Sequence, residues 1–270
     1  MDTVRISVLM TAYNNASLIG ETIESVLNQT FTDFELLICD DASADDTWQT
    51  IENYRLKDQR IKTFRNEANL GIAANRNKLL SLAQGQYVAM HDNDDISLPE
   101  RLHTQYEYME KHPDVVACGS FLEYFDERDG RQLRTYPASH TELRQRLYRD
   151  CPIGTPSLFM RTDIARKAGG FGLGYKYTDD LDLYFRLIPF GNLANIQQVL
   201  VKYRRHSNAN SIKNFLVLER ETLEIRYKYK QQIPMSLFDK IFNLLEVISV
   251  YIVPTRLKIW LFTTFRNSTI

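Results

Sequence analysis

The sequence contains little cysteine and no segment typical of export. Its three cysteines are widely spaced, and none belongs to the C-x-x-C pair that marks zinc and redox sites. The apolar stretch at residues 6–10 is too short for the core of a signal peptide, and no basic segment precedes it. We therefore expect a reduced, cytoplasmic setting without secretion.

Net charge and glycine-rich phosphate loops are also missing. The 33 Lys and Arg residues nearly balance the 34 Asp and Glu residues, leaving a formal net charge of −1. A dedicated nucleic-acid-binding protein has a strong basic excess instead. The first expected strand is followed by TAYN at residues 11–14, not by G-x-G-x-x-G, and no G-x-x-x-x-G-K-[ST] is present. We therefore expect no nucleic-acid partner, no dinucleotide fold and no P-loop.

No long uncharged apolar run is present either. The longest apolar stretch, residues 238–253, contains Glu246 and stops before Pro254. It falls short of the ~18–20 uncharged residues that a membrane-spanning helix requires. We expect no spanning helix.

What the sequence does contain is the pattern of a globular α/β protein. Of its 270 residues, 44% are hydrophobic and 25% charged, which is enough to form a core. Up to about residue 119, short apolar runs alternate with stretches at helical spacing, as in βαβ units. The expected strands are 6–10, 34–39, 61–64, 87–90 and 115–118, and the expected helices are 18–28, 46–56, 72–83 and 99–112. We predict a mostly parallel sheet flanked by helices, a less regular half at 120–215 and a helical extension at 216–270.

An acidic cluster, DNDD at residues 92–95, follows the fourth expected strand. Ligands of open α/β sheets bind beyond the carboxyl ends of the strands. Three neighbouring carboxylates repel one another unless a cation or hydrogen-bond donors compensate, and such oxygen ligands suit Mg²⁺ or Mn²⁺. The alternative is that Asp94 or Asp95 caps the helix beginning near residue 97, which would explain one aspartate and not three.

Three further features are candidates with ordinary structural alternatives. The acidic turn at Asp40 and Asp41 could bind a base or ribose, but Asp is also a common turn residue. Arg76, early in an expected helix, could reach a diphosphate or simply face solvent. Asp179 and Asp180 begin another expected helix, where the helix dipole favours acids, and one of them could act as a general base.

Taken in order, these segments resemble the family 2 glycosyltransferases of the GT-A fold. The resemblance spans roughly residues 4–210, and its segments are TAYN at 11–14, DDAS at 40–43, NLG at 69–71, ANRN at 74–77, DNDD at 92–95, GGF at 169–171, DDLD at 179–182 and YRRH at 203–206. It implies an enzyme that transfers a sugar, with inversion, from a nucleotide-diphosphate-sugar, usually a UDP-sugar, with the help of Mn²⁺ or Mg²⁺.

For the donor, the resemblance implies that the ring of Tyr13 stacks on the base and that Asp41 hydrogen-bonds it. It implies further that Arg76 contacts the nucleotide and that Asp92 lies toward the ribose. The donor-binding set so implied is Thr11, Tyr13, Asp40, Asp41, Arg76, Asp92 and Asp94.

For the chemistry, the resemblance implies that Asp94 holds the metal, which His206 completes in some family members, and that Asp180 is the catalytic base. The sequence departs from the family at Asp179, where Glu is usual, and at Gly172, where an acid is common. It also lacks the Q-x-x-R-W motif of processive synthases. We therefore expect one sugar to be added per event, to a glycan or lipid-linked oligosaccharide in polysaccharide biosynthesis.

The last segment, residues 226–270, combines apolar residues with seven basic and two acidic ones, a net charge of +5. Two interpretations stay open. The segment could make a peripheral contact with an anionic membrane, at the inner face of the cytoplasmic membrane. Alternatively, it packs on the catalytic domain or forms a homodimer contact.

Two other functions compete with glycosyl transfer. A sugar-phosphate nucleotidyltransferase also places metal-binding carboxylates on a parallel sheet, but it should begin with a glycine-rich loop, which TAYN is not. A non-catalytic module that binds nucleotide-sugars or glycans would not need both Asp94 and Asp180.

Overall fold

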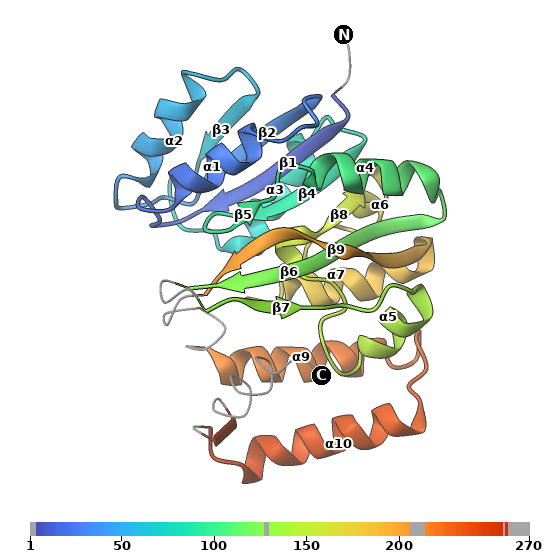
Figure 1. Cartoon of the computed structure of the whole chain (residues 1–270). Coiled ribbons are helices and arrows are strands. Elements are labelled where there is room, and N and C mark those ends of the chain that lie inside the picture. Colours follow the sequence, from blue (N-terminus) through green and yellow to red (C-terminus); the bar gives the residue numbers. More distant parts are fainter. Residues whose placement is uncertain (1–3, 127–129, 206–213, 256, 259–270) are drawn as a thin grey trace.

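The computed structural model describes residues 4–126, 130–205, 214–255 and 257–258. Its centre is a nine-stranded sheet in the order β3-β2-β1-β4-β8-β6-β9-β5, with β7 paired to β6. Helices lie on both sides of this sheet, and two further helices follow at the C-terminal end of the described chain (Figure 1).

The first half is the predicted βαβ arrangement. Strands β1 to β4 are mutually parallel and stand where the alternating pattern predicts strands. Each strand extends one or two residues farther than predicted, into the polar segment that follows it. The elements are β1 (Ile6–Ala12), α1 (Ile19–Leu27), β2 (Phe34–Asp40), α2 (Thr47–Arg55), β3 (Ile61–Arg65), α3 (Ile72–Leu82) and β4 (Tyr87–Asp92).

Alternate residues of the strands face opposite layers, because side chains along a strand alternate in direction. Leu9 of β1 belongs to one buried cluster, together with Leu79 of α3. The preceding residue, Val8, belongs to the other cluster, together with Ile23 of α1. The sheet is therefore the middle of three layers, which explains why its central strands are apolar on both faces.

The second half contains a long strand that the sequence pattern did not predict. This strand, β9 (Asn192–Arg204), runs parallel to β6 (Val115–Phe125) with register shifts in the pairing. Those register shifts interrupt the alternation of buried and exposed side chains along β9, so the sequence does not show the period of two that identifies a strand. The other elements are β5 (Ile96–Ser97), α4 (Arg101–Lys111), β7 (Gln132–Arg134), α5 (His140–Arg146), β8 (Phe159–Arg161), α6 (Thr162–Lys167), α7 (Asp179–Leu187) and two short 3₁₀ helices at Thr155–Ser157 and Ile188–Phe190.

The C-terminal extension is helical, as predicted, and consists of α9 (Phe215–Tyr229) and α10 (Leu237–Ile252). The ring of Tyr229 stacks on Phe185 of α7 with centroids 4.9 Å apart. The Tyr148 hydroxyl donates to the carbonyl of Ile233 at 2.6 Å, just before α10. In the described part of the chain, no helix is long and apolar enough to cross a membrane.

Candidate active site

The polar strand ends predicted from the sequence meet at one edge of the sheet. In the parallel register, Thr11 pairs with Asp92 and Ala12 pairs with Asp40. Thr11 is partly buried, and the ring of Tyr13, in the loop after β1, is 50% exposed. The last residues of β1, β2 and β4 therefore lie side by side, where an α/β sheet binds its ligand.

Asp40 is completely buried and organises the turn after β2. Its carboxylate accepts hydrogen bonds from the backbone N–H and the hydroxyl of Ser43. It also pairs with Arg65 of β3, whose Nε lies 3.1 Å from Asp40 Oδ2. These contacts are those of a turn residue, and they fix the position of the neighbouring Asp41.

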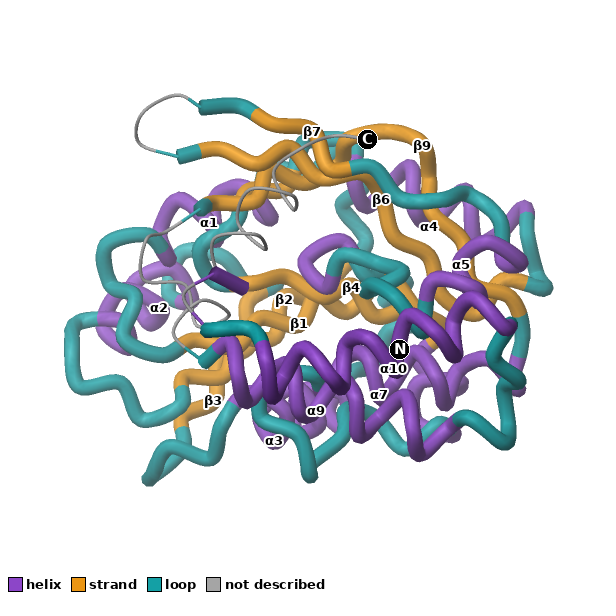
Figure 2. The backbone as a smooth tube through the Cα atoms, turned by 90° about the horizontal axis from the view of Figure 1, so that it is seen from below, coloured by secondary structure: helices purple, strands orange, loops and turns teal. Residues whose placement is uncertain are grey.

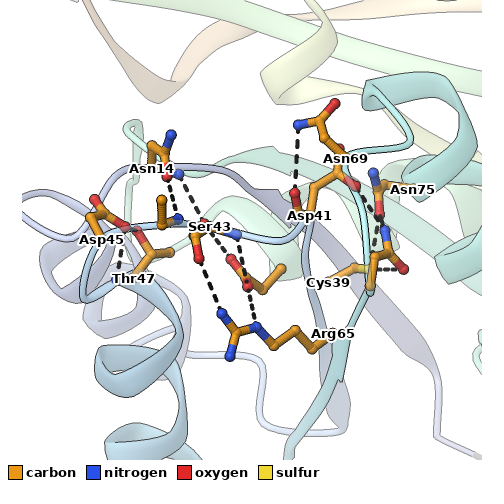
Figure 3. Close-up of polar contacts among 12 residues, drawn as sticks. Asn14, Cys39, Asp41, Ser43, Asp45, Thr47, Arg65, Asn69 and Asn75 are labelled. Carbon is orange, nitrogen blue, oxygen red and sulfur yellow. Dashed lines mark hydrogen bonds and ion pairs between the residues drawn. The ribbon is translucent and has the colours of Figure 1, made fainter.

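Asp41 joins this turn to the loop that begins α3 (Figure 3). Its two carboxylate oxygens accept hydrogen bonds from the backbone N–H groups of Leu70 and Gly71, at 2.8 and 2.9 Å. Gly71 has a φ of +84°, in the left-handed region that favours glycine, and α3 starts at the next residue. Asp41 therefore sets where α3, and Arg76 on it, begin relative to the strand ends.

Arg76 is buried between two carboxylates from opposite halves of the fold. Its Nη1 donates to Asp179 Oδ2 at 3.0 Å, and its Nη2 donates to Asp92 Oδ1 at 3.2 Å. Its guanidinium also lies 5.2 Å from the centre of the Phe171 ring. Burial alone would lower the pKa of Arg76, but Asp179, Asp92 and Asp180 outweigh burial and raise it. Arg76 is therefore a fixed positive charge at this edge.

Asp179 is the more buried of the two acids that begin α7, and its side chain is 3% exposed. Burial, together with the neighbouring charge of Asp180, raises the pKa of Asp179 to about 6 against the opposing effect of Arg76. Sequence reasoning placed Asp179 in the first turn of a helix but did not predict its contact with Arg76, which lies 103 residues away.

Asp180 occupies the same helical turn but is less buried. Its Oδ2 accepts a hydrogen bond from the Thr155 hydroxyl, and its Oδ1 accepts one from the backbone N–H of Leu181 at 2.7 Å. These bonds orient the carboxylate while leaving it partly open to solvent. Thr155 was missed from the sequence because it lies in a 3₁₀ turn without a distinctive motif.

The acidic cluster after β4 divides into a buried and an accessible part. Asp92 and Asp94 are partly exposed, whereas Asp95 is completely buried. Burial raises the pKa of Asp95 well above its usual value, and Asp94 and Asp92 raise it further. Asp95 thus retains its proton more readily than an ordinary aspartate, which reduces repulsion within the cluster. The two remaining carboxylates are those that a ligand can reach.

Arg204, at the end of β9, supports this cluster from the neighbouring strand. Its backbone N–H donates to Asp95 Oδ1 at 2.8 Å, and its Nε donates to the carbonyl of Asp94 at 2.9 Å. Sequence analysis singled out the segment containing Arg204 for His206, not for this arginine. His206 itself lies outside the described residues.

A second buried arginine, Arg101, contacts the residues on either side of the acidic cluster at 92–95. Arg101 of α4 donates from Nη2 to the carbonyl of Met90 at 2.6 Å and from Nη1 to the Ser97 hydroxyl at 3.0 Å. Ser97 Oγ also lies 3.3 Å from His91 Nε2. Burial lowers the pKa of Arg101 to about 10 and lowers that of His91 well below its usual value. These side chains fix the end of β4 against the core.

The carboxylates at this edge fit a divalent cation that arrives with a diphosphate. Among the described residues, no three His, Cys, Asp or Glu side chains form a site that could hold a metal by themselves. Mg²⁺ sites that use substrate phosphates need only one or two protein carboxylates, and Asp92 and Asp94 supply that number.

The sequence matches a known protein family and named relatives. Residues 7–169 match the family model described as "Glycosyl transferase family 2". The chain is 30% identical over 220 residues to the Escherichia coli protein named UDP-Glc:alpha-D-GlcNAc-diphosphoundecaprenol beta-1,3-glucosyltransferase WfaP, covering 80% of this chain and 84% of that one.

Solved structures agree on the fold. TarS residues 1–349 of Staphylococcus aureus, in complex with UDP-GlcNAc, superpose with a TM-score of 0.70 at 20% identity, covering 96% of this chain and 75% of that one. Another TarS crystal structure holds a longer chain, of which this protein spans 44%. The mannosyltransferase PcManGT of Pyrobaculum calidifontis, in complex with GDP-Man and Mn²⁺, gives a TM-score of 0.68 at 15% identity, covering 98% and 76% of the two chains.

The match to the family model covers more than half of the chain, and the sheet with its flanking helices is that of the solved neighbours. The predicted GT-A fold is thereby confirmed, and the protein belongs to glycosyltransferase family 2.

Proposed function

We propose that the protein transfers a single sugar, with inversion, from a UDP-sugar to a hydroxyl of a glycan or lipid-linked acceptor in polysaccharide biosynthesis. The observation that supports this most directly is the position of Arg76. It joins Asp92, at the strand ends that suit a donor, to Asp179, which is adjacent to the candidate base Asp180. This contact supports the proposal because it places the residues assigned to the donor and the residue assigned as base at one edge of the sheet.

On the donor side, the proposal assigns Tyr13 to stack on the base and Asp41 to hydrogen-bond it. Thr11 and Asp40 complete the proposed donor-binding site. Arg76 neutralises the charge of the diphosphate with the N–H donors of its guanidinium. UDP is proposed as the nucleotide because WfaP is named for UDP-Glc and one TarS structure holds UDP-GlcNAc. The sugar on UDP is either a hexose or an N-acetylhexosamine, and the donor screen described below distinguishes the two.

For the metal, we propose that Asp94 holds Mn²⁺ or Mg²⁺ with the diphosphate, while Asp92 lies toward the ribose. His206 is kept as a proposed additional ligand from outside the described residues. Such an ion, when bound, stabilises the charge that develops on the leaving diphosphate. The Mn²⁺ complex of PcManGT agrees with a role for a divalent ion in this fold.

Asp180 is proposed as the general base that removes the proton of the acceptor hydroxyl as it attacks the sugar. Its carboxylate is oriented by Thr155 and the Leu181 N–H, so that little reorganisation is needed before proton transfer. In this scheme residues 1–119 bind the donor, residues 120–215 shape the acceptor site, and residues 216–270 form the extension. WfaP is named for a diphosphoundecaprenol-linked acceptor, which supports a lipid-linked one here.

The test is a screen of UDP-sugars for metal-dependent release of UDP, with and without lipid-linked acceptors. Asp94→Ala and Asp180→Asn should each lower kcat by about a hundredfold or more, because each removes a metal ligand or a base. Chelation with EDTA should abolish activity, and added Mn²⁺ or Mg²⁺ should restore it. Asp163→Ala is the matched control, since Asp163 is an exposed acid of α6 whose ion pair is with Lys167, also of α6.

Full activity in both variants on the best donor would refute the site assignment. Release of pyrophosphate from a nucleotide and a sugar phosphate would instead indicate a nucleotidyltransferase. Donor binding without turnover on any acceptor would indicate a non-catalytic module.

A further inference from the structure

Helix α10 exposes an unusual amount of apolar surface. The side chains of Leu237, Tyr251 and Ile252 are 74%, 84% and 73% exposed. We define the apolar face of α10 as a set of exposed, uncharged side chains on one side of this helix: Leu237, Ile241, Leu245, Ile248, Tyr251 and Ile252. In Figure 1, α10 lies beyond α9 and is the helix farthest from the sheet.

The spacing of these residues puts them in a single stripe. At about 100° per residue, they fall within an arc of roughly 120°, and the sixteen residues of α10 extend over about 24 Å. The stripe is convex, because its residues project from the outside of the helix and not from the walls of a groove. A convex apolar surface of this length suits a deformable partner such as the interfacial layer of a bilayer.

Both acids of α10 point away from this stripe. Asp239 caps the helix and pairs with Arg149, whose Nε lies 2.6 Å from its Oδ1. Glu246 pairs with Arg226 of α9. The one remaining charged side chain of α10 is Lys240, which is exposed. The exposed part of α10 therefore combines apolar side chains with one positive charge, while both acids are paired.

A second cation lies close to Lys240. Lys230 and Lys240 both line a cavity of about 220 Å³ between α9 and α10, whose walls include Leu244 and Val247. Ammonium groups beside apolar walls match the chemistry of an anionic lipid, whose phosphate and acyl chains are adjacent.

The chain beyond α10 returns to the end of the molecule that holds the candidate active site. Lys258 Nζ lies 2.7 Å from Glu219 Oε1, in the second turn of α9. Two residues later, Glu221 accepts hydrogen bonds from the backbone N–H of Tyr177 and the hydroxyl of Thr178, immediately before Asp179. Figure 1 shows α9 between α7 and α10, and the three helices overlap when seen from below in Figure 2. The C-terminal end of α10 is thus at the end of the molecule where α7 begins with Asp179 and Asp180.

We propose that the apolar face of α10 docks the protein on an anionic membrane surface, with Lys240 and Lys230 contacting lipid headgroups. That this docking delivers a lipid-linked acceptor rests on the proposed function. Membrane binding itself does not rest on that function, and it is measured without any enzymatic reaction.

The experiment is flotation of the full chain with vesicles of phosphatidylcholine alone or mixed with phosphatidylglycerol. The unaltered protein should float with the mixed vesicles. The double variant Leu245→Gln with Ile252→Gln should bind about tenfold or more weakly, because it removes two exposed apolar side chains without adding charge. Lys240→Gln should weaken binding to the anionic vesicles by about fivefold and leave binding to neutral vesicles unchanged.

The matched control is Leu56→Gln, since Leu56 is also highly exposed, at 74%, but follows α2 on another part of the molecule. UDP release from a soluble donor should be unchanged in the double variant, which separates docking from catalysis. Three results would overturn the proposal: no flotation of the unaltered chain, equal flotation of the double variant, or a dimer in sedimentation that becomes a monomer in the double variant. A lower melting temperature of the double variant without vesicle binding would show that protein atoms cover this face.

Discussion

Arg76 is the residue on which the two halves of the candidate site converge. A buried guanidinium between two carboxylates is stable only while both partners remain, because an unpaired buried charge is costly. The same contacts give it a defined direction, toward the edge where a diphosphate would bind. Its role in donor binding stays a prediction.

A conservative change at Arg76 tests that prediction. Arg76→Lys retains the charge but loses the fork that reaches Asp92 and Asp179 together. We expect the KM for the UDP-sugar to rise by about tenfold or more, with a smaller change in kcat. Steady-state kinetics against donor concentration measure both constants.

Arg166→Lys is the control for this experiment. Arg166, like Arg76, makes several hydrogen bonds with its guanidinium, but its acceptors are the backbone carbonyls of Leu80 and Ala83 and it lies in α6, outside the candidate site. An equal rise of KM in both variants would argue for a general loss of stability, and an unchanged KM in Arg76→Lys would contradict donor binding.

The raised pKa of Asp179, about 6, predicts a pH dependence of stability. In the unfolded chain this carboxyl ionises near its ordinary value of 3.8, so between about pH 4 and pH 6 the folded protein retains a proton that the unfolded chain has lost. The stabilisation is therefore complete below about pH 4 and is lost as the pH rises through about 6. Its size is at most about 3 kcal/mol.

Asp179→Asn cannot titrate, so its free energy of unfolding should decrease less steeply over this range. Denaturant unfolding at a series of pH values measures both proteins. Asp95 titrates in both and its contribution cancels in the difference. Identical slopes for the two proteins would show that the Asp179 carboxyl is not perturbed.

At the scale of elements, α7 connects the candidate site to the C-terminal extension. Asp182 of α7 is buried and accepts hydrogen bonds from Lys228 and Tyr229 of α9, each at 2.9 Å. It also pairs with Arg186 of α7 at 2.7 Å. A single carboxylate thus holds α9 to the helix that presents Asp180.

Replacing that carboxylate should loosen the extension. Asp182→Asn keeps the shape but removes the charge that Arg186 and Lys228 require, and we expect the free energy of unfolding to fall by about 2–4 kcal/mol. Asp163→Asn, at an exposed surface pair, should change it by less than about 0.5 kcal/mol. Denaturant unfolding measures the free energy of unfolding of each variant. If Asp182→Asn lost no more of it than the control, Asp182 would not hold α9 to α7.

The elements differ in how well their sequence predicts them. The first four strands and the helices between them follow clear apolar periods, and each was predicted to within two residues. Strand β9 was missed because shifts in its pairing with β6 disrupt the alternation. Local patterns detect regular elements, whereas an irregular strand is defined by its partner.

At the scale of the whole molecule, the formal net charge of −1 conceals an uneven distribution. The acids gather at the sheet edge, where Asp92 and Asp180 lie near the buried Arg76 and Asp94 lies near Asp95. The tail, residues 226–270, carries a net charge of +5. In α10 its two acids pair with arginines of α9 and of the segment after α5, so the outer side of that helix keeps only positive charge.

The sequence by itself determined the α/β class, the strand ends that form the candidate site, and the family, because periodicity and short motifs are local properties of the chain. Only the tertiary structure decided that Arg76 joins Asp92 to Asp179, that Asp95 and not Asp94 is the buried acid, and that α10 leaves an apolar face exposed. Those outcomes depend on packing between segments up to 103 residues apart, where burial and neighbouring charges set the state of each side chain.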